Sequence, residues 1–157
     1  MNVLDSYIRE GLEALDKAEV EYLVCGGYAV NFHGYRRTTG NIDIWLAPDN
    51  DNKAKVIAAL RSLKTDSRSM KALQGMDFKQ QLLFTDGEEP YKMNFMTRLQ
   101  DLSFDKAWNK RVVSGLDKID IPFLGLHDLL ASKQGSKLPK DRMDVEQLEK
   151  ISRIKNG

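Results

Sequence analysis

Apolar and polar residues alternate along this chain with two periods, one helical and one extended. Over about residues 2–17 the apolar positions recur three or four residues apart with charged residues between them, which predicts an amphipathic helix. The run VEYLVC at 20–25 favours a strand, and Gly26 and Gly27 end it. The run YAVNFH at 28–33, closed by a further glycine, predicts a short second helix.

The middle of the chain continues this alternation. IDIWL at 42–46 predicts a second strand, and Asp49 or Asn50 is placed to cap the helix that follows, whose apolar face runs to Leu63. Residues 64–80 are polar and show no clear period, and DGEEP, which begins at Asp86, predicts a turn. Further strands are expected at 81–85, 91–96, 112–113 and 119–121.

The last third of the chain has mainly helical periodicity. Helices are expected at 104–109 and 126–133, and a C-terminal helix begins at about Asp141, with that residue as its N-cap. No repeat, low-complexity tract or long linker divides the sequence, so we expect one domain over 1–157. The order of elements predicts an α/β fold: a mixed sheet of roughly four to six strands flanked by helices, with a helical C-terminal element.

Composition narrows the classes of partner and compartment. The 157 residues include 24 Lys and Arg against 23 Asp and Glu, so the net charge of +1 gives no reason to expect nucleic acid as an obligatory partner. The only cysteine, Cys25, cannot form an internal disulfide. With no apolar leader and no membrane-length apolar run, the pattern predicts a cytoplasmic protein without a membrane partner. We interpret Cys25, His33, Trp45 and Trp108 as structural residues.

A glycine pair between a strand and a helix suits the binding of phosphate. Without side chains, Gly26 and Gly27 let backbone N–H groups approach an anion, and the helix start adds a partial positive charge there. Further donors for phosphate oxygens are expected a few residues on, from Arg36, Arg37, Thr38 and Thr39. The glycines alone are weak support, because most such pairs are plain turns; the order and spacing of the whole stretch are more specific.

Two polar residues on the second strand complete this group. Asn41 and Asp43 are spaced i and i+2, so their side chains point to one face of the strand, close to the glycines if the two strands are neighbours. Carboxylates at such positions hold Mg²⁺ between protein and substrate phosphates.

These motifs resemble a known family. The stretch GGYAVNFHGYRRTTGNIDIWL is similar to the signature of small bacterial nucleotidyltransferase-fold proteins, which include AbiEii-type abortive-infection toxins. In that family a short helix ends in His-Gly, and an Arg-Thr turn leads to Asp-x-Asp on a strand. The segments YKMNFMTRLQDLSFDKAW and LHDLLASKQGSKLPKDRMDVEQL resemble the family's third carboxylate strand and its closing helices. The resemblance extends from about Val20 to Ile151.

The resemblance implies a nucleotidyltransferase fold and the transfer of NMP from an NTP with Mg²⁺ or Mn²⁺. In the family three carboxylates bind two metal ions, and here Asn41, Asp43 and Asn94 occupy those positions. Two of the three are therefore neutral amides, which compensate little of the charge of a hard cation, so weak metal binding is expected. The implied acceptor is an RNA, a protein hydroxyl or a small molecule.

The resemblance also implies which residues bind the phosphates, and it leaves open an alternative function. Gly26 and Gly27 hold the phosphates, Lys133 is a further phosphate ligand, and Lys140 and Asp141 lie nearby. The alternative function keeps the fold without catalysis: a catalytically impaired protein that binds a nucleotide or a small partner protein, within a toxin–antitoxin type of system. The two asparagines favour this alternative, whereas the glycines, the Arg-Thr turn and the one aspartate favour transfer.

Overall fold

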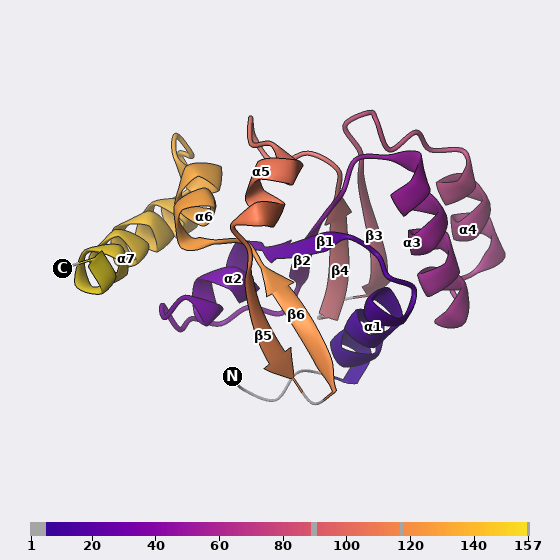
Figure 1. Cartoon of the computed structure of the whole chain (residues 1–157), viewed down its shortest axis with the longest axis horizontal. Coiled ribbons are helices and arrows are strands. Elements are labelled where there is room, and N and C mark those ends of the chain that lie inside the picture. The colour runs from indigo at the N-terminus through magenta and orange to yellow at the C-terminus, as the bar shows by residue number, and fades with distance from the viewer. Residues whose placement is uncertain (1–5, 89–90, 117, 157) are drawn as a thin grey trace.

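The computed structural model describes residues 6–88, 91–116 and 118–156. In these ranges a six-stranded mixed sheet lies between two groups of helices (Figure 1). In that view α1, α3 and α4 lie to the right of the sheet, and α2, α6 and α7 lie to the left. The strands are β1 (Tyr22–Cys25), β2 (Ile42–Leu46), β3 (Leu83–Glu88), β4 (Tyr91–Met96), β5 (Val112–Leu116) and β6 (Ile119–Phe123). The helices are α1 (Ser6–Lys17), α2 (Gly26–Phe32), α3 (Asn50–Ser62), α4 (Ser67–Gln74), α5 (Phe104–Asn109), α6 (Leu126–Lys133) and α7 (Pro139–Asn156).

The sheet has the strand order β3-β4-β2-β1-β6-β5. The two central strands, β1 and β2, are antiparallel to each other, and each has a parallel outer neighbour, β6 and β4. Hairpins then add the edge strands β3 and β5. Because both central strands are buried, they consist almost entirely of apolar residues, and Asp43 is the one ionisable side chain in β2.

The α/β fold with a mixed sheet and a C-terminal helix is as the sequence predicts, but several boundaries differ. The predicted start of the first helix at residue 2 lies outside the described residues. Gly26 and Gly27 form the first turn of α2 and do not separate it from β1. The hairpin between β3 and β4 is tighter than predicted, because β3 continues through Asp86 to Glu88. Helix α7 begins at Pro139, where a proline is well tolerated, so Asp141 lies inside its first turn and is not the N-cap.

Sequence periodicity missed α4 entirely. Only two of its residues, Met70 and Leu73, are buried, so its apolar face is too narrow to stand out in a polar stretch. Its signal is instead a capping residue: the Asp66 side chain accepts a hydrogen bond from the backbone N–H of Ser69 at 2.9 Å. Asp49 caps α3 in the same way and is one of the two caps, Asp49 or Asn50, that the sequence offers.

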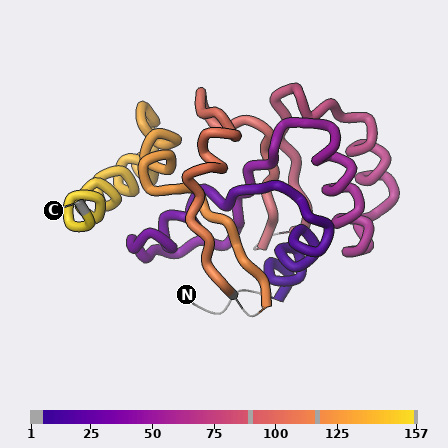
Figure 2. Tube along the Cα trace, viewed as in Figure 1, coloured from indigo at the N-terminus to yellow at the C-terminus, as the bar shows by residue number. Residues whose placement is uncertain are grey.

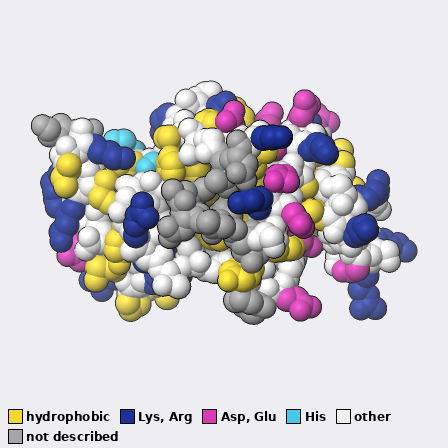
Figure 3. Space-filling model, turned by 90° about the horizontal axis from the view of Figure 1, so that it is seen from below, with side chains coloured by type: hydrophobic (Ala, Val, Ile, Leu, Met, Phe, Trp, Pro, Cys, Tyr) yellow, Lys and Arg dark blue, Asp and Glu magenta, His cyan; other side chains and the backbone are white. Residues whose placement is uncertain are grey.

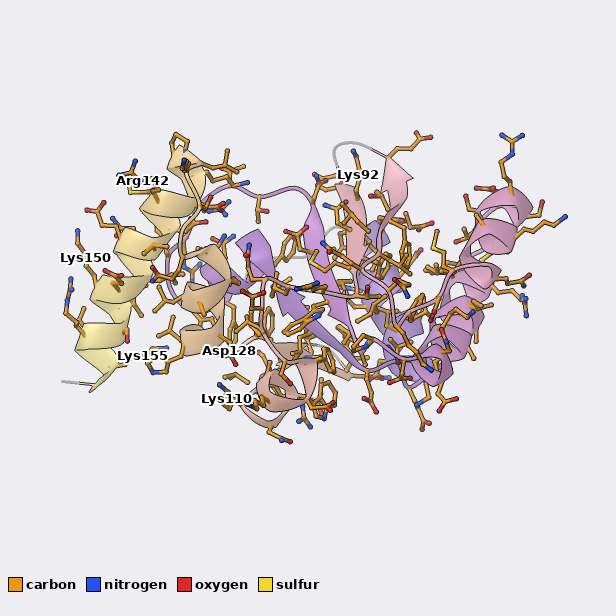
Figure 4. The ribbon with its side chains drawn as sticks, turned by 90° about the horizontal axis from the view of Figure 1, so that it is seen from above. Lys92, Lys110, Asp128, Arg142, Lys150 and Lys155 are labelled. Atoms are coloured by element: carbon orange, nitrogen blue, oxygen red, sulfur yellow. The ribbon has the colours of Figure 1, made fainter. Side chains whose placement is uncertain are left out.

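The C-terminal helices return the chain to α2. Figure 2 shows the trace passing from β6 into α6 and α7, beside the α2 segment. Phe32 of α2 stacks on Phe123 of β6 with ring centroids 4.1 Å apart, and His33 Nε2 lies 2.7 Å from the Leu124 backbone oxygen. Lys110, which follows α5, forms an ion pair with Asp128 of α6 at 3.1 Å, and the two side chains face each other in Figure 4. Within the described ranges, none of the helices has the length and apolar content needed to cross a bilayer.

His33 predicts a pH dependence of stability. Burial lowers the pKa of His33, and the nearby charge of Lys155 lowers it further, while the hydrogen bond to Leu124 acts in the opposite direction. The unfolded chain holds this histidine at a pKa near 6.5 and therefore binds more protons than the folded chain just below that pH. The free energy of unfolding should fall as the pH drops below 6.5. Above that pH the histidine is neutral in both states, so it should make no pH-dependent contribution.

Urea unfolding between pH 5 and pH 8 measures this dependence. His33→Gln keeps a donor for the Leu124 oxygen without a titrating group, so its stability should vary less across this range. The matched control is His127→Gln, because His127 is the other histidine of the chain and is exposed. Equal pH dependence in His33→Gln and wild type would contradict the assignment.

Candidate functional site

A row of polar side chains crosses four strands of the sheet. Cys25 of β1 pairs with Asp43 of β2, Asp43 pairs with Asn94 of β4, and Asn94 pairs with Thr85 of β3. Residues paired across strands share one face of a sheet. The structure therefore brings together two of the residues predicted from sequence, Asp43 and Asn94, which are 51 positions apart in the chain.

Hydrogen bonds run along this row. Asn94 Nδ2 donates to Asp43 Oδ1 at 3.0 Å, and Thr85 Oγ1 donates to Asn94 Oδ1 at 3.0 Å. Asp43 and Asn94 are half-buried, and Thr85 is exposed. The row therefore presents one carboxylate and one amide to the surface, with a hydroxyl that fixes the orientation of the amide.

The backbone at Gly26 is shaped by the carboxylate of Asp43. Gly26 has φ +60°, in the left-handed region that favours glycine, and a Cβ atom there would lie 2.1 Å from Asp43 Oδ2. Gly27 is buried, and its Cβ would lie 2.6 Å from Thr39 Oγ1 and 3.2 Å from Arg37 Nη1. The glycine pair thus allows three polar side chains to approach the first turn of α2.

Arg37 and Lys133 meet a carboxylate that the sequence analysis did not single out. Asp144 of α7 is fully buried; it accepts hydrogen bonds from Arg37 Nε at 2.7 Å and from Arg37 Nη2 at 2.9 Å. Lys133 Nζ lies 3.1 Å from Asp144 Oδ2 and 3.2 Å from Asp141 Oδ1. These four residues, which we call the ion cluster, hold the loop after α2 against both C-terminal helices. The sequence carries no local signal for this pairing, because Asp144 looks like any exposed acidic residue of a charged helix.

The other predicted residues lie apart from the row. Asn41 comes just before β2, and its side-chain oxygen accepts a hydrogen bond from the backbone N–H of Lys92 at 3.1 Å, so it closes the end of the β2–β4 ladder. Thr38 and Lys140 are exposed. Of the two threonines predicted as phosphate donors, Thr39 is the one whose hydroxyl reaches the glycine pair.

Cys25 forms the β1 end of the row and is a core residue, as the sequence predicts. It is 2% exposed, and its Sγ lies 3.6 Å from the Asp43 backbone oxygen and 4.0 Å from Met96 Sδ. Burial raises the pKa of the Cys25 thiol, and the negative charge of Asp43 raises it further; the positive charge of Lys133 acts against both. The thiol is therefore not activated as a nucleophile.

The charged groups of this region are too few for a protein-only metal centre. Across 6–88, 91–116 and 118–156, no group of three or more His, Cys, Asp or Glu side chains is arranged to hold a metal ion. Asp43 is the row's only carboxylate, and the ion cluster already pairs its own carboxylates with Arg37 and Lys133.

Comparison with known proteins supports the fold. No family model matches the chain, and no curated protein matches its sequence. Among solved structures, the chain is similar to the lincosamide antibiotic adenylyltransferase LnuA in its lincomycin-bound crystal structure, with a TM-score of 0.54. The match covers 96% of this chain and 99% of that chain, at 16% sequence identity. The chain therefore shares a nucleotidyltransferase fold over nearly its whole length, while its relation to AbiEii-type toxins stays a prediction.

The ion cluster predicts a large loss of stability on removal of one charge. Asp144→Asn leaves Arg37 without its carboxylate in a buried setting, and we expect the free energy of unfolding to fall by about 3 kcal/mol. Glu149→Gln makes the same kind of change at an exposed position of α7 and should alter it by less than about 0.5 kcal/mol. Chemical denaturation of both variants measures the difference. Similar values for the two would show that the ion cluster does not hold the C-terminal helices.

The environment of Cys25 predicts slow thiol chemistry. Its burial and raised pKa both reduce the thiolate available to a water-soluble disulfide reagent, so native protein should be labelled slowly and denatured protein quickly. The measurement is the release of the coloured leaving group over time in buffer and in urea. Rapid labelling of native protein would show that the β1 end of the row is open to solvent.

Proposed function

We propose that this chain binds a nucleoside triphosphate with one divalent cation at Asp43 and the Gly26-Gly27 turn, and transfers NMP to a hydroxyl acceptor. The observation that carries the proposal is the juxtaposition of a half-buried carboxylate, an amide and a side-chain-free helix turn on one open row. The shared fold with an adenylyltransferase supports it. Glycine backbone N–H groups suit triphosphate oxygens, which need close approach by donors.

The side chains of the row fit one cation better than two. Mg²⁺ is commonly held by one or two carboxylates together with substrate phosphates, and Asp43 supplies one carboxylate. The Asn94 carbonyl supplies a neutral oxygen once its amide turns, because the Thr85 hydroxyl can accept a hydrogen bond from the amide as readily as it donates one. With a single charged ligand, such an ion binds weakly without nucleotide and is held mainly by the phosphates.

The roles of the protein groups follow from their positions. The cation would offset negative charge on the phosphates during transfer. Asp43 orients the nucleotide, and the ion cluster keeps the loop after α2 in place. In the reaction the acceptor oxygen bonds to the α-phosphorus, the bond from that phosphorus to the β-phosphate oxygen breaks, and pyrophosphate leaves while the hydroxyl proton passes to water. The nucleotide contributions of Arg37, Thr38 and Lys133, and the cytoplasmic setting, stay predictions.

One contact favours the alternative of binding without catalysis. The Asn94 amide donates a hydrogen bond to Asp43, whereas a carboxylate at position 94 would repel that of Asp43 unless a cation lay between them. A protein with this row binds a nucleotide but transfers it slowly or not at all. A small partner protein in a toxin–antitoxin type of system belongs to this alternative.

Substitutions in the row separate these functions. Asp43→Asn should weaken the binding of Mn²⁺ with ATP or GTP at least tenfold, because it removes the only charged ligand of the row. Asn94→Asp should strengthen that binding about tenfold, since two carboxylates then share the cation. Asn41→Asp should have the smaller effect, because its side chain contacts the Lys92 backbone. Paramagnetic relaxation of water during Mn²⁺ titration measures all three.

The control is Asp120→Asn, the same chemical change at an exposed position of β6. Transfer of label from α-³²P ATP and GTP is then measured with Mg²⁺, with lincomycin as one acceptor because the LnuA structure contains it. Nucleotide binding without labelled product in any variant would favour the alternative. Unchanged Mn²⁺ and nucleotide binding in Asp43→Asn would remove the row from both functions.

A further inference from the structure

A recess lies on the same face of the sheet as Asp43. It is a pocket of about 350 Å³ bordered by the end of β2, the segment before β3, the segment after β4 and the start of α5. Trp45, Leu102 and Phe104 supply apolar surface, and Lys79, Gln81 and Arg98 supply hydrogen-bond donors. None of the residues assigned to the row or to the ion cluster lines this pocket.

Strand register places the pocket next to the row. Trp45 is two residues beyond Asp43 on β2, and its partners in the next row across the sheet are Leu23, Met96 and Leu83. Two residues span about 6.6 Å along a strand, and their side chains share a face. Leu83 is 75% exposed, so the β3 side of this face is open between the row and the pocket. Trp45 therefore joins the wall of the pocket to the strand that carries Asp43.

The chemistry of the pocket indicates what it binds. Trp45 is 1% exposed, and its indole nitrogen, a donor only, has no hydrogen-bond partner among the described residues. Buried donors are nearly always satisfied, so an unpaired one is unusual in a residue that lines the pocket. Lys79 and Arg98 outnumber the one lining carboxylate, Asp105. The pocket thus favours a molecule with an apolar part and several acceptor oxygens.

The volume of the pocket and the charge of its lining favour a small-molecule acceptor over a macromolecular one. The volume falls within the range of about 300–1,000 Å³ for small-molecule sites. A groove for RNA needs a run of basic side chains along the phosphate backbone. Two basic side chains, Lys79 and Arg98, line this pocket. The face seen from below in Figure 3, away from α5, carries Lys and Arg side chains interspersed with Asp and Glu side chains.

We infer that this pocket binds the acceptor of the transfer reaction, a small hydroxyl-bearing molecule with an apolar part, and directs one hydroxyl along the sheet toward Asp43. This inference rests on the proposed function. It selects a small molecule from the three classes of acceptor that the sequence left open. It also assigns Trp45, which the sequence analysis placed in the core, a second role at the pocket wall.

Trp45 provides a reporter that requires no catalysis. The chain has two tryptophans, so Trp108→Phe leaves Trp45 as the only indole. We choose a panel of 4-nitrophenyl glycosides as probes, because each joins hydroxyl groups to an apolar ring with acceptor oxygens and quenches tryptophan emission. At least one glycoside should quench Trp45 saturably, with a dissociation constant in the millimolar range or tighter. If no glycoside gives saturable quenching, the inference is overturned.

A matched pair of variants tests the location. Gln81→Tyr in the Trp108→Phe background adds bulk at the mouth of the pocket and should weaken glycoside binding at least tenfold. Gln74→Tyr makes the same change at an exposed position of α4 outside the pocket and should leave binding unchanged. Circular dichroism checks that both remain folded. Equal binding by the two folded variants would overturn the assignment.

Nucleotide experiments keep this inference distinct from the proposed function. With ATP, Mg²⁺ and a bound glycoside, mass spectrometry should show a phosphodiester of AMP and the glycoside, and Gln81→Tyr should reduce its yield at least tenfold. Label transferred to bulk tRNA but not to glycosides would overturn the inference while supporting the proposed function. Saturable quenching in a chain that binds no nucleotide would refute the proposed function and, with it, the acceptor role of the pocket.

Discussion

The candidate site depends on the absence of a side chain at Gly26. The carboxylate of Asp43 occupies the space that a Cβ atom would fill, at 2.1 Å, and the backbone there has φ +60°. A larger residue would meet both a steric conflict and a strained backbone, so α2 could no longer begin directly beside β2. This contact places the first turn of the helix, the central strand and the one carboxylate of the row within reach of the same ligand.

The ion cluster extends that constraint to the C-terminal third of the chain. Gly27 leaves room for Arg37 beside α2, and Arg37 is held by two hydrogen bonds to a carboxylate on α7. Lys133 shares the same carboxylate, so α6 and α7 are fixed relative to the loop after α2. Ion pairs in this setting are sensitive to the loss of one partner because the remaining charge stays buried. The cluster therefore links the position of the last helices to the geometry around the glycine pair.

The chemistry of the row depends on the pairing of one carboxylate, Asp43, with one amide, Asn94. A carboxylate and an amide can share a hydrogen bond without a cation, whereas two carboxylates in those positions would repel each other. Under the proposed function, a cation would have to turn the amide before it gained a second oxygen ligand. Such an exchange would favour binding of the cation together with nucleotide over binding of the cation alone, and it would suit either slow transfer or binding without transfer.

The fold and the site were predictable from the sequence to different extents. Periodicity, glycines and caps are local properties, so they determined the type of most elements, the glycine turn and the place of Asp43 in a buried strand. The partnership of Asp43 with Asn94 was expected only from resemblance, because strand pairing over 51 positions leaves no local trace. Helix α4 was not predicted, because only two of its residues are buried and its apolar periodicity is therefore weak. Tertiary packing alone decided the burial of Asp144, the partners of Arg37 and the position of the pocket. In the sequence, a charged residue on a helix looks solvent-exposed until another element covers it.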